Sequence, residues 1–115
     1  MYREERKIYF STPELFKALA LFCETTNLRF PFDDDAKLDF RTESELVATL
    51  SDPDQSDVTR EFLESEVIVA LILLCKKMDI PVARKAVKTI ELSEENIVFA
   101  MKLSDESATI HDLSS

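Results

Sequence analysis

The amino-acid sequence predicts an α+β fold: two main helices, one of them central and buried, packed on a small antiparallel sheet with a C-terminal β-hairpin. Residues 11–27 and 57–79 have the apolar spacing or content of core helices, and residues 84–103 alternate as two strands do. The chain has 115 residues, 45% of them hydrophobic and 32% charged, which suits one globular domain.

The first expected elements are a short strand at residues 7–10 and an amphipathic helix. Ser11 followed three residues later by Glu14 is a capping box, the reciprocal pairing that begins many helices. Pro13 suits the first turn, where its missing N–H has no helical partner to lose. The apolar stripe of this helix ends near Asn27, where we expect the helix to stop.

The middle of the chain predicts loops and short elements. Residues 28–36 read as a loop, and residues 37–41 as a half-exposed strand in which apolar and charged residues alternate. Residues 42–50 begin with a second capping-box pattern, so we expect a short helix, although the same residues also suit a strand. Residues 51–57 read as a loop.

A long helix is expected next, starting at Ser56 or Asp57 and ending near Asp79, because Pro81 disfavours helical geometry in the residue before it. Residues 67–75 are its most hydrophobic part, and they are apolar on all sides. We therefore expect this helix to be covered on several sides. Nine apolar residues are far fewer than the roughly 20 that a membrane span needs, so none is predicted.

The last predicted element is the hairpin. Ile97, Phe99 and Met101 alternate with smaller or charged residues, and residues 93–96 form its turn. We place the single domain at residues 1–103 and expect the polar residues 104–115 to form a flexible tail. No internal repeat is expected.

The chain contains no glycine, although average usage of about 7% would give several. P-loops and dinucleotide-binding turns need glycine where the backbone approaches a phosphate, so neither is expected. Positions with positive φ must then use Asn or Asp, and Asn27 and Asn96 are the candidates.

The net charge of −9 is unevenly distributed along the chain. Residues 30–66 hold twelve acidic and three basic residues, which argues against nucleic-acid binding because phosphates would be repelled. Residues 67–103 hold six basic and four acidic residues, with a local basic cluster of Lys76, Lys77, Arg84, Lys85 and Lys88. Such patches steer association, within one molecule or between two.

The sequence offers little support for a catalytic site or a metal site. Cys23 and Cys75 read as buried thiols in a reducing compartment, so we expect a cytoplasmic location. The single histidine, His111, lies in the tail and reads as solvated. The acidic loops fail the register of an EF-hand, leaving only weak divalent-cation binding as an alternative. We expect no enzyme, no bound metal and no cofactor.

The leading functional expectation is a non-catalytic protein-interaction or regulatory module that binds a protein partner or itself. Two surfaces are candidates, an aromatic loop beside three aspartates and the outer face of a hairpin strand at a sheet edge. Their residues are Phe30, Phe32, Asp33, Asp34 and Asp35, and Val98 and Ala100.

Two alternatives stay open. The first is a domain that binds a small anion through Arg84, Lys85 and Lys88. The second is an acidic decoy that engages a basic, nucleic-acid-binding protein through residues 30–66.

Overall fold

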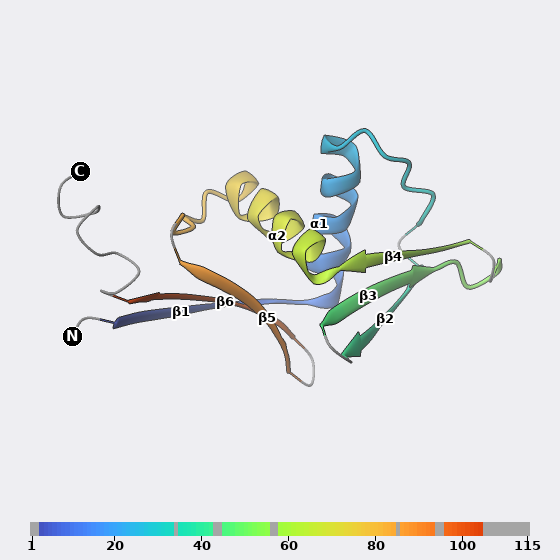
Figure 1. Ribbon diagram of the computed structural model, residues 1–115. Coiled ribbons are helices and arrows are strands. Elements are labelled where there is room, and N and C mark those ends of the chain that lie inside the picture. The colour runs from blue at the N-terminus through green and yellow to red at the C-terminus, as the bar shows by residue number, and fades with distance from the viewer. Residues whose placement is uncertain are drawn as a thin grey trace.

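The structure is a computed structural model, and it describes residues 3–33, 35–42, 45–55, 58–84, 86–93 and 96–104. Two helices lie against each other over two three-stranded antiparallel sheets (Figure 1). The α+β prediction is therefore confirmed, with two small sheets in place of one. The tail, from residue 105 onward, lies outside the described residues.

Sheet A combines the C-terminal hairpin with the first strand of the chain, whereas sheet B is made of three consecutive strands. Sheet A has the order β1-β6-β5 and sheet B the order β2-β3-β4. The strands of sheet A are β1 (Arg3–Phe10), β5 (Val87–Leu92) and β6 (Ile97–Ser104). Those of sheet B are β2 (Lys37–Thr42), β3 (Leu46–Ser51) and β4 (Thr59–Leu63).

Helix α1 (Thr12–Thr25) forms as predicted. The Ser11 side chain accepts a hydrogen bond from the backbone N–H of Glu14, whose carboxylate accepts one from the Ser11 N–H at 2.8 Å. The turn after the helix closes at Asn27, which has φ of 60° and thus takes the left-handed conformation expected of it.

Helix α2 (Glu64–Lys77) begins later than predicted, because residues 59–63 form β4. The proposed start at Ser56 or Asp57 is wrong; both residues lie outside the described part. Phe62 is fully buried opposite Ala48 of β3, so burial in sheet B decides its conformation. The Glu66 carboxylate then accepts a hydrogen bond from the Leu63 N–H as α2 begins.

The expected short helix at residues 42–50 is also wrong, because β3 occupies most of it. Leu46, Ala48 and Leu50 are buried, while the residues between them are half-exposed. This period of two places one apolar face on the core, which a helix would not do. The capping-box pattern at Thr42 therefore does not begin a helix.

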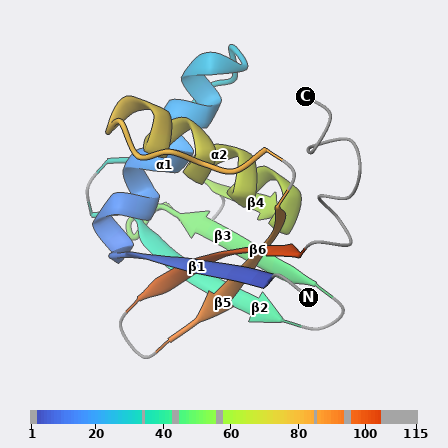
Figure 2. The same ribbon diagram turned by 90° about the vertical axis from the view of Figure 1, so that its left-hand side faces the viewer.

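The C-terminal hairpin is confirmed, but its second strand is not at an edge. β6 pairs with β5 on one side and with β1 on the other (Figure 2). Val98 and Ala100 are consequently buried, at 4% and 0% exposure, on the face of sheet A away from the helices. The prediction that they form an exposed edge surface is wrong.

An ion pair spans the central strand on this face of sheet A. Lys7 of β1 and Glu91 of β5 lie opposite Ala100 and Val98 and meet at 3.5 Å. The charge of Glu91 and its hydrogen bond raise the pKa of Lys7. Arg41 and Glu61 form the same kind of pair across β3 in sheet B, at 2.7 Å.

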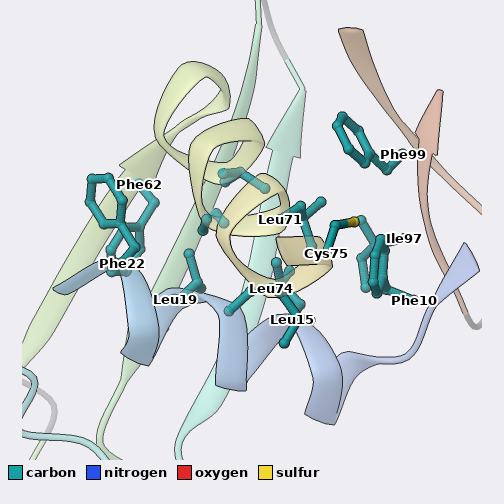
Figure 3. Close-up of a cluster of buried hydrophobic side chains, with 14 of the residues drawn as sticks. Phe10, Leu15, Leu19, Phe22, Phe62, Leu71, Leu74, Cys75, Ile97 and Phe99 are labelled. Carbon is teal, nitrogen blue, oxygen red and sulfur yellow. The ribbon is translucent and has the colours of Figure 1, made fainter. Parts of the chain in front are cut away.

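The core lies between the helices and the sheets. Leu15, Leu19 and Phe22 of α1 face Leu71 and Leu74 of α2 (Figure 3). Residues 67–75 therefore supply the central helix, as expected. The helix is not covered on all sides, however, because Val69 is 45% exposed.

The chain contains an internal repeat, contrary to the expectation from the sequence. The order β1-α1-β2-β3 recurs as β4-α2-β5-β6. The buried helix positions recur at one constant offset, which aligns Leu15 with Val67 and Cys23 with Cys75. The aligned sets are Leu15, Ala18, Leu19, Phe22 and Cys23 in α1, and Val67, Ala70, Leu71, Leu74 and Cys75 in α2. We call residues related by this offset equivalent positions.

The two repeats interlock. The first strand of each pairs with the hairpin of the other, since β1 joins β6 and β4 joins β3. Each sheet therefore contains strands from both repeats.

Candidate functional site

The aromatic loop predicted as a partner surface is packed onto the core. Phe30 makes edge-to-face contacts with Phe16 and with Phe32, at centroid distances of 5.2 and 5.4 Å. Phe32 is only 7% exposed and Phe30 is half-buried. The structure therefore leaves little ring surface for a partner.

The aspartates beside this loop are solvent-facing where the structure describes them. Asp33 and Asp35 are exposed, and Asp34 lies outside the described residues. Among the described residues, no group of His, Cys, Asp or Glu is arranged to hold a metal ion.

A groove forms where α2 ends and the chain passes into β5. Its volume is about 530 Å³. We call it the α2 groove; its lining residues are Ile72, Lys76, Ile80, Pro81, Val82, Arg84 and Lys88. Residues 80–84 run beside α2 on the sheet A side of the molecule (Figures 1 and 2). The groove therefore combines an apolar floor with three basic side chains.

Two of these basic residues, Arg84 and Lys88, were predicted as an anion site. The structure brings them together with Lys76, while the third predicted residue, Lys85, lies outside the described part. Within that part, Lys76, Arg84 and Lys88 form no ion pair with a carboxylate. Their positive charge is therefore available to a ligand.

Hydrogen bonds hold the walls of the groove in place. The Lys88 ammonium donates to the carbonyls of Arg84 and Ala86, both at 3.0 Å, which leaves one of its three N–H donors. The Arg6 guanidinium donates to the Pro81 carbonyl at 2.8 Å. The connection from α2 to β5 is thus tied both to itself and to β1.

Two backbone hydrogen bonds at the end of α2 set the direction in which the connection leaves the helix. Ile80 N–H donates to the Cys75 carbonyl at 2.8 Å and Asp79 N–H to the Lys76 carbonyl at 3.2 Å, which is a Schellman ending. Asp79 has φ of 59°. This turn sets Ile80 against the core and lets Val82 and Arg84 follow alongside the helix.

The sequence predicted the cations of the groove but not its apolar lining residues. Ile72, Ile80 and Val82 are half-buried and pack against the core cluster. Their spacing is that of ordinary core residues, so only the structure shows that they also line an open surface.

The two cysteines are free and buried. Cys23 and Cys75 are buried and unpaired, and burial raises the pKa of both thiols above the ordinary value. The positive charges of Arg60 near Cys23 and Arg6 near Cys75 oppose this shift without overcoming it. His111 lies outside the described residues.

Comparison with known proteins finds no family model, no curated protein and no solved structure that matches this chain. In the described part of the chain, neither helix has the length and apolar character needed to cross a membrane.

Proposed function

We propose that this chain is a non-catalytic binding module whose α2 groove takes an acidic segment of a protein partner. The observation that carries the proposal is the set of Lys76, Arg84 and Lys88 around an apolar floor, in a chain whose net charge is −9. An excess of cations at one place in an acidic protein favours a ligand that supplies the missing carboxylates.

The apolar floor adds a second requirement. Ile72, Ile80 and Val82 retain partial exposure, so a ligand that covers them gains free energy from buried apolar surface. The preferred ligand therefore carries apolar groups as well as negative charge.

A protein segment suits this groove better than a compact metabolite. Lys76 and Arg84 are exposed at the rim, and Lys88 has already used two of its donors on backbone carbonyls. A small ligand usually has most of its surface enclosed and its charge met by converging donors. A linear segment that lies along the rim needs neither full enclosure nor converging donors.

A compact organic anion is the second candidate function. The groove volume of about 530 Å³ lies within the usual range of small-molecule sites and favours this alternative. We also propose a cytoplasmic location, which the free, buried Cys23 and Cys75 support.

Fluorescence anisotropy tests the proposal with a labelled hexapeptide of alternating aspartate and leucine. We expect saturable binding by the parent chain and an affinity at least about tenfold lower for Arg84→Glu, because the substitution reverses one charge at the rim. Lys102→Glu makes the same kind of change on an exposed residue of β6 outside the groove and should bind as the parent does.

Competition by inorganic phosphate or citrate separates the two candidates. If either anion displaces the peptide at low concentration and raises the melting temperature of the parent but not of Arg84→Glu, the small-anion function is correct. Equal peptide affinities for the two Glu variants would contradict the groove as the site.

A further inference from the structure

We infer that the segment bound in the α2 groove presents an aromatic side chain followed by acidic residues, in the order found at residues 30–33 of the first repeat. This inference rests on the proposed function and names the chemistry of its ligand. The internal repeat supports it, since the connection that follows α1 carries two aromatic rings at positions whose equivalents after α2 line the groove.

The two connections begin in the same way. Leu28 N–H donates to the Cys23 carbonyl at 2.7 Å, and at the equivalent positions of the second repeat Ile80 N–H donates to the Cys75 carbonyl at 2.8 Å. The left-handed residues Asn27 and Asp79 are also equivalent. In both repeats the chain therefore leaves the helix in the same direction relative to its last turn.

The similarity of the two connections continues at the next residue, whose carbonyl accepts a hydrogen bond from the other repeat in both cases. The Arg60 guanidinium of β4 donates to the Arg29 carbonyl at 3.2 Å, and that of Arg6 in β1 donates to the Pro81 carbonyl at 2.8 Å. Arg29 and Pro81 are again equivalent positions. In each repeat, therefore, an arginine from the other repeat's first strand holds the connection.

The repeats differ at the positions that follow. The first has Phe30 and Phe32, whose rings contact each other and, through Phe30, the Phe16 ring. The second has Val82 and Arg84 at the equivalent positions, and both line the open groove. Two aromatic rings in one repeat are thus replaced by a small apolar side chain and a cation in the other.

The charges of the side chains at equivalent positions also differ between the two repeats. Lys76 is equivalent to Glu24, and Arg84 to Phe32, so the second repeat gains positive charge around the groove. In the first repeat the aromatic residues run directly into an acidic stretch in which Asp33 is exposed. A ligand with aromatic residues followed by carboxylates would therefore supply both the rings that the second repeat lacks and the charge that its cations face.

The chain itself provides the probe for the experiment. A labelled peptide with the sequence of residues 30–35, FPFDDD, is titrated into the full chain by fluorescence anisotropy. We expect saturable binding, weakened about tenfold or more when serine replaces both phenylalanines, because the buried aromatic surface is lost. Replacing the three aspartates by asparagine should weaken binding by a similar factor.

A substitution in the groove tests the position directly. Val82→Phe places a ring at the position equivalent to Phe30, so it should fill the floor and weaken FPFDDD binding about tenfold or more. Val87→Phe adds the same ring at a position that is 59% exposed and outside the groove, and it should bind as the parent does. Arg84→Glu, at an exposed site, provides a second test if Val82→Phe does not fold.

The outcomes separate this inference from the proposed function. If the serine peptide binds as tightly as FPFDDD, or if Val82→Phe and Val87→Phe bind equally, the aromatic inference is wrong. If the aspartate–leucine hexapeptide binds the groove while FPFDDD does not, the inference fails and the proposed function stands. If neither peptide binds the parent chain, both are overturned.

Discussion

Asn27 and Asp79 show at the scale of single residues how a chain without glycine ends its helices. Both have φ near 60°, a conformation that most residues with a side chain avoid and that Asn and Asp tolerate best. The missing glycines predicted residues of these two types, and Asn27 is confirmed, whereas Asn96, the other candidate, is not among the described residues with positive φ. Asp79 was expected to end α2 but not named as a left-handed residue, because Pro81 already explained the stop.

Replacing Asp79 by glycine should stabilise the protein. Glycine adopts positive φ without steric cost, and the change also removes a negative charge from the C-terminal end of a helix, where the dipole disfavours it. We expect Asp79→Gly to raise the melting temperature by about 2 °C, on the order of 0.5 kcal/mol. Asp79→Asn isolates the charge effect, and a glycine variant that melts below the asparagine variant would contradict this explanation of the turn.

At the scale of elements, local sequence was sufficient where periodicity and caps agreed, as in α1 and the hairpin. It was insufficient for β3 and β4, whose conformations depend on pairing with each other. Phe62 pairs with Ala48 and packs against Phe22, and no short window of sequence contains these residues. The helix that was expected to start at Ser56 or Asp57 begins only at Glu64.

Leu71 tests the placement of α2 in the core. Its side chain is fully buried, so Leu71→Asp both removes buried apolar surface and leaves a carboxylate without water. The combined cost, several kcal/mol, is comparable to the whole stability of a typical domain, and we expect the variant to be unfolded by circular dichroism at about 25 °C. Val69→Asp places the same charge on an exposed position of the same helix and should leave the melt nearly unchanged.

At the scale of the whole molecule, the repeat was hidden because its equivalent positions are ordinary ones. The buried residues of α1 and α2 follow the spacing of any amphipathic helix, so their recurrence at a constant offset carries little information by itself. The crossed strand pairing and the crossed bonds of Arg6 and Arg60 make the relationship visible.

The candidate site was only partly predictable from the sequence. Arg84 and Lys88 stood out as a basic cluster, whereas Phe30 and Phe32 were candidates for a partner surface and instead pack against the core. The difference between the repeats explains both results. One connection packs its own aromatic rings against the core, and the other lines a basic groove.

The central claim is that this groove is the binding surface, and nuclear magnetic resonance tests it most directly. A ¹⁵N-labelled chain is titrated with the aspartate–leucine hexapeptide while the backbone amide shifts are followed. We expect the largest saturable changes at Ile72, Lys76, Val82 and Lys88. No saturable change, or changes concentrated on sheet B or on the outer face of sheet A, would contradict the claim.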